Sequence, residues 1–319
     1  MQTEMQKTDM KSQAQSVISQ VRKVIVGKDR VLLWVFGTML AGGHILLEDI
    51  PGVGKTTMAV AFSKVLGLGY NRVQFTPDVL PSDVTGYSIP DAVTGQLRYQ
   101  PGAVLCNLFL ADELNRATSR TQSALLEAME EGQVTVDGVS HPIPKPFVVI
   151  ATQNPTGAAG TQMLPDSQMD RFMVRLSLGY PEQEEEKAMV MNRRGRNPMQ
   201  ELQHLLTAEN LLAMQEEVAK THVGEVVVDY AVRLIAATRE HEQILRGASP
   251  RATLAVVSLS QAVAQLHGRD YVVPRDVQES FRMAVAHRLL LTPQALGSGI
   301  TAELLLTQIV EKVHAPRLS

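Results

Sequence analysis

Residues 44–62, HILLEDIPGVGKTTMAVAF, constrain the fold more strongly than any other stretch of the chain. A short apolar run precedes a glycine-rich loop, and a segment with helical spacing of apolar residues follows it. In this order of strand, loop and helix, backbone N–H groups can surround phosphate groups. The spacing nearly matches G-x-x-x-x-G-K-[ST], but Asp49 replaces the first glycine. Because aspartate tolerates the turn conformation expected there, we interpret the stretch as a nucleotide site rather than an ordinary turn.

The loop supplies the residue types that bind a nucleoside triphosphate. Gly52 and Gly54 let the backbone approach the phosphates closely, and Lys55 is expected to reach the β- and γ-phosphates. Thr56 is expected to ligate Mg²⁺. The residues predicted to contact the nucleotide here are Pro51, Gly52, Val53, Gly54, Lys55, Thr56 and Thr57.

Short apolar runs recur along the first half of the chain and mostly do not alternate with polar residues. Strands that are buried on both faces have this pattern, which predicts a parallel α/β sheet flanked by helices. Helices are expected over residues 13–41, with a break at 24–27, and over 55–67. The expected strands cover residues 44–48, 72–75, 107–112, 147–152 and 173–178.

Two segments interrupt this alternation and are expected to be hairpin insertions. Residues 86–99 read as two short strands around a turn, and residues 132–143 alternate around Asp137-Gly138, a strong hairpin signal. Insertions of this kind often carry the specific function of a protein.

The character of the sequence changes after GYPEQEEEK, residues 179–187. No strand pattern returns, and apolar residues follow helical spacing. We therefore predict a P-loop core over residues 1–180 and a small all-helical domain over 181–319, with the boundary near Tyr180-Pro181.

Composition limits the class of protein. The 319 residues are 45% hydrophobic and carry a net charge of −3, so they can build a core and give no global basic field for nucleic acid. The single cysteine, Cys106, cannot form an internal disulfide and fits a reducing compartment. The polar N-terminus lacks the apolar core of a signal peptide, so a cytoplasmic location is expected. Glycines break the apolar run 31–47, which argues against a membrane span.

Two polar strand ends are candidates for the chemistry. The run LFLADE places Asp112 and Glu113 at the C-terminal edge of a strand, where open α/β sheets bind ligands. Asp112 is expected to hold Mg²⁺, and Glu113 is expected to orient and deprotonate the attacking water. Asn154, in IATQNP, could bind the γ-phosphate or that water, although by itself the residue is better explained as part of a plain polar turn before proline.

Two arginines are further candidates. Arg171, in PDSQMDRF, could neutralise charge on the transferred phosphoryl group, or it could be a surface residue paired with Asp170. Arg251 follows a good N-cap, Ser249, and sits in a first helical turn, where the helix dipole disfavours a cation. That placement suggests an anionic partner, although the side chain could also simply extend into solvent.

These pieces, in this order, resemble the AAA-plus ATPases and, more closely, the MoxR family, which is similar to the ATPase subunits of magnesium chelatase. The motifs that carry the resemblance are VRKVIVGKDRVL, LAGGHILLEDIPGVGKTT, DELNRATSRTQSALLEAMEEGQVTVDG, IATQNP and DSQMDRF, and the match runs through most of residues 20–290. In this family the loop often begins with a residue other than glycine.

The resemblance implies roles for these residues. Lys55 and Thr56 match Walker A, and Asp112 and Glu113 match Walker B. Asn154 matches sensor 1, Arg171 the arginine finger supplied to a neighbour, and Arg251 sensor 2, which reaches the γ-phosphate from a helical lid. Val26 and Gly27 belong to a turn along the adenine. The implied fold is a five-stranded parallel core with a helical lid, and the implied cofactors are ATP and Mg²⁺.

The leading functional hypothesis is a Mg²⁺-dependent ATPase that remodels or matures partner proteins. The resemblance implies a ring, commonly a hexamer, and partners with von Willebrand factor A domains. A nucleic-acid motor is the first alternative, but the 132–143 hairpin carries His141 and neither Lys nor Arg, so nucleic acid is an unlikely ligand. The second alternative, a nucleotide-gated scaffold without turnover, disagrees with the presence of Glu113.

Overall fold

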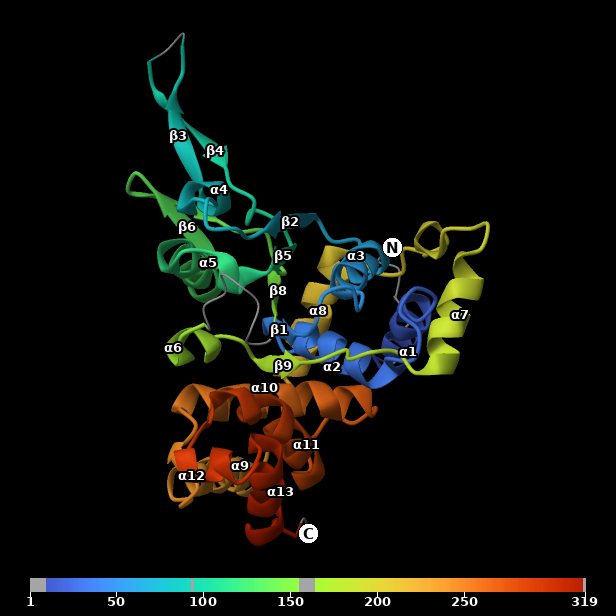
Figure 1. Cartoon of the computed structure of the whole chain (residues 1–319), viewed down its shortest axis with the longest axis vertical. Helices are drawn as coiled ribbons and strands as arrows, with labels where there is room; N and C mark the ends of the chain where they lie inside the picture. Colours follow the sequence, from blue (N-terminus) through green and yellow to red (C-terminus); the bar gives the residue numbers. More distant parts are fainter. Residues whose placement is uncertain (1–9, 93–94, 155–163, 318–319) are drawn as a thin grey trace, which may run out of the picture.

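The computed structural model describes residues 10–92, 95–154 and 164–317. Its centre is a five-stranded sheet in the order β2-β5-β8-β1-β9, with every neighbouring pair parallel (Figure 1). The strands are β1 (Ile45–Glu48), β2 (Tyr70–Gln74), β5 (Leu108–Asp112), β8 (Val148–Gln153) and β9 (Val174–Leu176). The predicted parallel sheet is confirmed, and the strand bounds differ from the expected ones by at most two residues.

The non-alternating sequence of the strands has a direct structural cause. All residues of β5 and β8 are buried, and alternate residues enter two different apolar clusters on the two faces of the sheet. Leu108 and Leu110 join one cluster, while Phe109 and Ala111 join the other. A strand that is buried on both faces has no position left for an outward polar residue.

Helices cover both faces of this sheet. The cluster on one face includes apolar residues of α1 (Met10–Val21), α2 (Asp29–Leu40) and α3 (Lys55–Val65). The other cluster includes residues of α4 (Pro81–Thr85), the 3₁₀ turn η1 (Leu114–Arg116), α5 (Ser119–Glu131) and α6 (Asp166–Met169). The apolar run 31–47 divides into α2, a turn at Gly42 and β1, as expected. Among the described residues, no helix combines the length and the apolar character needed to cross a membrane.

Both predicted hairpins form. The first pairs β3 (Gly86–Pro90) with β4 (Leu97–Pro101) and projects from the body of the molecule, and the second pairs β6 (Gln133–Val136) with β7 (Val139–Pro142) (Figure 1). Asp137 and Gly138 both have positive φ, which is the conformation predicted for a two-residue turn. The rings of Tyr99 and His141 stack at 3.6 Å between centroids, so β4 of the first hairpin contacts β7 of the second.

The C-terminal half is helical, as predicted, with one addition. Its helices are α7 (Gln183–Arg193), α8 (Ala208–Ala219), α9 (Glu225–Arg239), α10 (Pro250–Leu266), α11 (Pro274–Val285), α12 (Pro293–Gly297) and α13 (Ala302–Lys312), with 3₁₀ turns η2 (Pro198–Gln200) and η3 (Ala286–Arg288). A short antiparallel pair, β10 (Ile244–Arg246) with β11 (Leu290–Leu291), was not expected, because two or three residues are too few for an alternating pattern.

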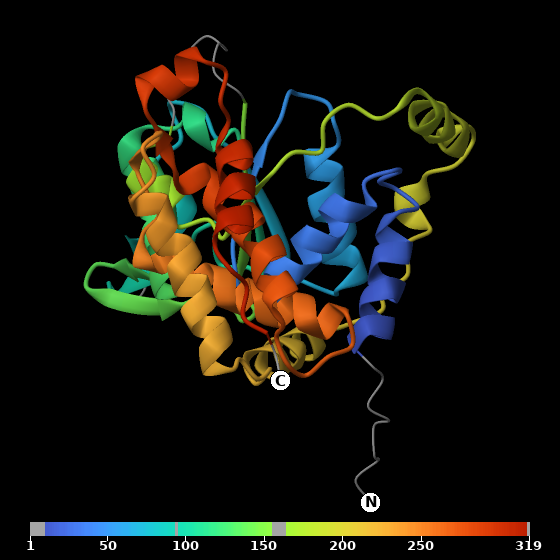
Figure 2. The ribbon, with the colours of Figure 1, turned by 90° about the horizontal axis from the view of Figure 1, so that it is seen from below.

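The helical half divides into two parts in space. Helix α7 stands apart from the bundle of α9–α13 in both views (Figures 1 and 2). Residues near it bind the core, since Lys28 donates to the carbonyl of Tyr180 at 2.9 Å. The bundle packs against the core, because α10 contacts α2 and α11 contacts the edge strand β9. One continuous apolar cluster joins the core helices to α8–α11 and α13.

Candidate nucleotide site

The glycine-rich loop between β1 and α3 forms one wall of a polar pocket of about 330 Å³. Gly52 and Gly54 have φ of 89° and 100°, a backbone conformation that side chains with a Cβ rarely adopt. The loop residues in the pocket wall are Pro51, Gly52, Gly54, Lys55, Thr56 and Thr57. Val53 is not in this wall, because its side chain packs against the apolar core.

Asp49 has a different role from the one expected. Its φ is not positive, so tolerance of a left-handed turn does not explain why aspartate occupies the first position of the loop. The buried carboxylate instead accepts three hydrogen bonds, from Ser177 Oγ at 2.8 Å, Leu178 N at 2.6 Å and Gly179 N at 3.0 Å. Asp49 therefore ties the start of the loop to the backbone that follows β9.

Lys55 folds back onto the loop that it follows. Its Nζ donates to the carbonyl oxygens of Asp49 at 2.6 Å and Ile50 at 3.2 Å. Burial lowers the pKa of this ammonium from its ordinary value, and nearby carboxylates of Asp49, Asp112 and Glu113 act in the opposite direction. A buried cation at the start of a helix is well placed to meet an anion that enters the pocket.

Asp112, the predicted Walker B aspartate, lines the same pocket as the loop. Asp112 Oδ1 accepts from Thr152 Oγ1 at 2.6 Å, and Oδ2 lies 3.4 Å from Thr56 Oγ1. A carboxylate and a hydroxyl are oxygen ligands of the kind that Mg²⁺ uses together with substrate phosphates. Among the described residues, no group of three or more His, Cys, Asp and Glu side chains is placed to hold a metal ion.

Glu113, the predicted catalytic base, is held on both carboxylate oxygens. Glu113 has φ 56° and ψ 45°, and its backbone N donates to Thr152 Oγ1 at 2.8 Å. Its Oε2 accepts from Arg116 Nη1 at 2.8 Å, and its Oε1 accepts from Asn154 Nδ2 at 3.2 Å. The Arg116 hydrogen bond is the main cause that lowers the pKa of Glu113 from its ordinary value. The two contacts orient the carboxylate and place it next to Asn154.

Four further residues of this site were not predicted from the sequence. Arg72 and Gln74 line the pocket from β2, and Arg72 Nη2 lies 2.8 Å from Asp112 Oδ2. Thr152 and Arg116 hold the two Walker B carboxylates. In the sequence, Thr152 and Gln74 are ordinary strand residues, and Arg72 does not differ from the arginines that lie on a protein surface. Arg72, Gln74 and Thr152 lie on strands next to β5, and the sequence alone does not give that strand order. Arg116 lies in the 3₁₀ turn η1, directly after β5.

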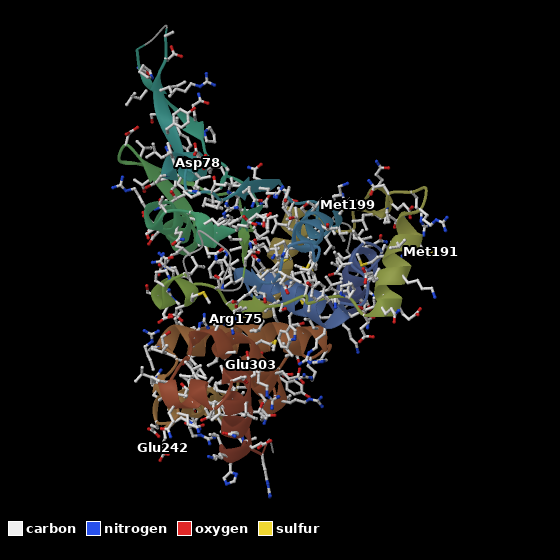
Figure 3. The ribbon with its side chains drawn as sticks, in the orientation of Figure 1. Asp78, Arg175, Met191, Met199, Glu242 and Glu303 are labelled. Carbon is white, nitrogen blue, oxygen red and sulfur yellow. The ribbon has the colours of Figure 1, made fainter. Side chains whose placement is uncertain are left out.

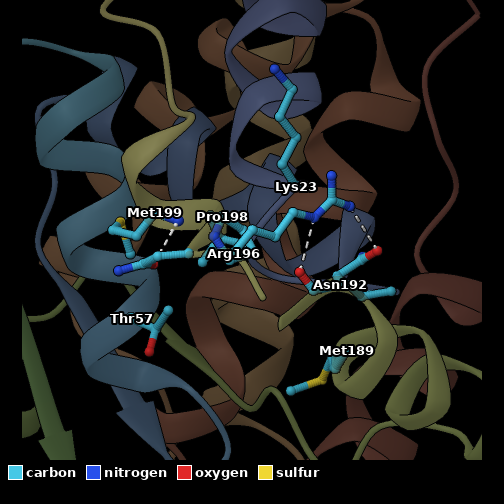
Figure 4. A pocket seen from close by; sticks show the side chains of 10 residues that line it. Lys23, Thr57, Met189, Asn192, Arg196, Pro198 and Met199 are labelled. Atoms are coloured by element: carbon cyan, nitrogen blue, oxygen red, sulfur yellow. Dashed lines mark hydrogen bonds between the residues drawn. The ribbon is translucent and has the colours of Figure 1, made fainter. Parts of the chain in front are cut away.

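A second pocket of about 420 Å³ shares Thr57 with the first and is shown in Figure 4. Val24 and Val26 line it from the turn after α1, and Met189, Pro198 and Met199 line it from the segment after the core. Its mixed apolar and polar wall suits a purine and a ribose. Val26, which was predicted to lie along the adenine, is one of the residues that line this pocket.

Gly27 lies beside this pocket and has φ 73°. A Cβ at this position would lie 1.8 Å from Glu185 Oε1. Glu185 caps α7 by accepting from the backbone N of Glu182 at 2.9 Å. The glycine thus allows the N-terminus of α7 to approach the turn that follows α1.

Arg171 and Arg251 lie together but are not among the residues that line the phosphate pocket. Both bind the carboxylate of Glu130 in α5, Arg171 at 3.2 Å and Arg251 through a short contact. Arg171 does not pair with Asp170, whose carboxylate accepts from Ser249 Oγ at 2.9 Å and lies 2.9 Å from Arg288 Nε. The predicted finger and the predicted sensor 2 therefore form one cluster, outside their own chain's phosphate pocket.

Comparison with known proteins agrees with this geometry. Residues 44–174 match the model of the "ATPase family associated with various cellular activities (AAA)", and residues 236–309 match the "AAA lid domain". The chain is 40% identical to Chaperone MoxR1 of Mycobacterium tuberculosis over 95% of its length and 82% of that protein. It is 43% identical to Bacillus subtilis YeaC over 94% and 93% of the two chains. A crystal structure from Cytophaga hutchinsonii, of a protein assigned as an ATPase, superposes with a TM-score of 0.89 at 35% identity, over 97% and 96% of the two chains.

Proposed function

Because this chain belongs to the MoxR family of AAA ATPases, we propose that it works as a Mg²⁺-dependent, ring-forming ATPase that remodels or matures partner proteins. The observation that carries the proposal is the separation of the two arginines from the phosphate pocket of their own chain. A ring of identical subunits with head-to-tail contacts brings one subunit's arginines to the next subunit's nucleotide.

Substrate binding uses both pockets. The loop N–H groups and Lys55 bind the phosphates, and the Val26 side of the adjoining pocket takes the adenosine. Two carbonyl contacts hold Lys55 at the loop before ATP binds. When ATP binds, Lys55 exchanges these contacts for phosphate oxygens. Thr56 and Asp112 would hold Mg²⁺, which supplies neutralisation of phosphate charge when bound.

Hydrolysis depends on Glu113 as the base. One carboxylate oxygen accepts a proton from the attacking water, while Asn154, 3.2 Å from Oε1, helps to orient that water. Both oxygens of Glu113 are engaged in this structure, so one of its two contacts must loosen as water enters. Arg171 and Arg251 stabilise the charge that develops on the transferred phosphoryl group, and they do so in the neighbouring subunit's site.

Glu130 keeps the two arginines together before they meet a phosphate. Both guanidinium groups bind its carboxylate, which therefore compensates two cations that lie side by side. Asp170 fixes the backbone around this pair, because it contacts Ser249 at the start of α10 and Arg288 after α11. These contacts link the segment that carries Arg171 to the lid helix that carries Arg251.

The partner is proposed to be a protein, and a protein with a von Willebrand factor A domain is our first candidate, from the family resemblance. A pull-down with Glu113→Gln tests this, because an ATP-bound subunit that does not turn over should retain its client. Lys55→Ala is the control, since it should not reach the ATP-bound state. Equal recovery of the same protein with both variants would argue against an ATP-dependent client.

A nucleic-acid motor has weaker support. The exposed positions of the β6–β7 hairpin carry no lysine or arginine for phosphate contacts, and the ring of His141 is already stacked on Tyr99. ATP turnover in the presence and absence of single- and double-stranded DNA tests this alternative, and stimulation by DNA would favour it.

A further inference from the structure

A groove of about 550 Å³ lies between α1, α2, α10 and α11, outside the nucleotide site. We call it the basic groove, defined by Lys11, Arg30, Leu33, Trp34, Leu266 and Arg282. One carboxylate, Glu279, also lines it and lies 3.1 Å from Arg275 Nε. Within the described part of the chain, Arg30 and Arg282 have no ion-pair partner, and the buried Nε of Arg282 has no hydrogen-bond acceptor. Leu33 is 41% exposed. Arg30 and Arg282 beside the exposed Leu33 indicate an acidic, partly apolar partner surface.

The opposite end of the lid carries such a surface. We call it the acidic lid face, defined by Glu240, Glu242, Leu245, Leu290 and Leu296. Leu245 and Leu296 are 63% and 60% exposed, and neither glutamate has a partner among the residues that the structure describes. Glu242 lies at the margin of the bundle (Figure 3), and the backbone N of Thr292 donates to Gln243, which joins the parts of this face. The nearby Arg246 is neutralised by Asp166.

Each surface lies on the same flank as one half of the catalytic site. The first turns of α1 line the basic groove, and Lys23 and Val24, just after α1, line the adenosine pocket. On the other flank, Arg251 follows β10 by five residues, and Arg288, next to β11, contacts Asp170 beside Arg171. Helix α10 joins the two flanks, and its 17 residues span roughly 25 Å at 1.5 Å per residue.

We propose that the acidic lid face of one copy of this chain docks in the basic groove of the next copy. The proposal rests on the ring proposed above and adds its second contact. A copy that presents Arg171 and Arg251 to its neighbour's phosphates also turns its acidic lid face toward that neighbour's basic groove. The contact is heterologous, because two different surfaces meet, and it therefore repeats around a closed ring.

Charge reversal tests the contact. Arg30 is the second residue of α2, where the helix dipole favours an acid, so Arg30→Glu should fold normally. Arg30→Glu and Glu242→Arg should each weaken ATP-dependent association by roughly tenfold or more in sedimentation velocity, because like charges then face each other. A chain with both changes should associate nearly as wild type. Arg120→Glu is the matched control, because Arg120 holds the same helix position in α5 and is absent from the groove.

Crosslinking provides a second readout that does not depend on affinity. Chains with Arg30→Cys are mixed with chains with Glu242→Cys, and a disulfide-linked dimer should form only in the mixture, since Cys106 is buried. The docking contact is overturned if both single charge-reversal variants associate as the wild type does. It is also overturned if the double variant associates no more tightly than the single variants. Either result leaves the ring intact. Absence of any ATP-dependent assembly by the wild type overturns the ring itself, and the docking contact with it.

Discussion

Asp49 offers a test in which motif matching and physical reasoning give opposite answers. The variant Asp49→Gly restores the first glycine of G-x-x-x-x-G-K-[ST], so a reading based on the motif alone expects no harm. The structure predicts a loss, because the carboxylate is 4% exposed and accepts three hydrogen bonds. Two of the donors are backbone N–H groups, of Leu178 and Gly179, which would lose their partner.

The magnitude follows from those donors. The buried N–H of Leu178, left without an acceptor, costs about 1–3 kcal/mol in Asp49→Ala, and the part-buried N–H of Gly179 adds less because water can reach it. Asp49→Gly should lose roughly 0.5–1 kcal/mol more, from the added backbone freedom of glycine in the unfolded chain. Asp49→Asn keeps one accepting oxygen and should lie between wild type and Asp49→Ala.

Urea unfolding without nucleotide measures this ranking directly, and the m-value shows whether the transition stays comparable among variants. ATP affinity should fall together with stability, because the carboxylate fixes the start of the phosphate-binding loop. Wild-type stability for Asp49→Gly would refute the reasoning, since it would mean that the three hydrogen bonds contribute nothing net.

Three other changes have defined outcomes. Glu113→Gln should bind ATP but hydrolyse it far more slowly, whereas Lys55→Ala should lose tight binding; near-normal turnover by Glu113→Gln would exclude the assigned base. Arg116→Gln should raise the pKa of Glu113 toward its ordinary value, so the acidic limb of the kcat profile should move to higher pH, and an unmoved limb would contradict the assigned cause. Gly27→Ala should lose more stability than Gly132→Ala; both have positive φ, but only Gly27 faces Glu185, so equal losses would show that this contact is unimportant.

The sequence predicts best what is contiguous. Lys55 and Thr56 belong to a motif that lies within one short stretch of sequence. Asp112 and Glu113 come at the end of a strand that is buried on both faces. The parallel sheet was predictable for the same reason, because its strands lack the alternation of a half-exposed sheet. The hairpin turn at Asp137-Gly138 was predictable because two adjacent residues determine it.

Relations between distant segments were not predictable. Thr152 and Arg72 reach Asp112 only because β8 and β2 are the neighbours of β5, an order that emerges from tertiary packing. Arg171 and Arg251, 80 positions apart, converge on Glu130, a residue that no local pattern distinguishes from other acids on α5. The short β10–β11 pair has too few residues to leave a pattern in the sequence.

Subunit mixing tests the central claim, that arginines of one subunit complete the neighbouring subunit's site. Arg171→Ala keeps its pocket and should bind ATP but hydrolyse it poorly, since arginine fingers contribute roughly 10³–10⁵ in rate. Lys55→Ala loses its pocket and keeps its arginine. In a mixed ring, an Arg171→Ala pocket beside a Lys55→Ala neighbour should recover hydrolysis that neither variant has alone. Proven subunit exchange without recovered hydrolysis would contradict the account.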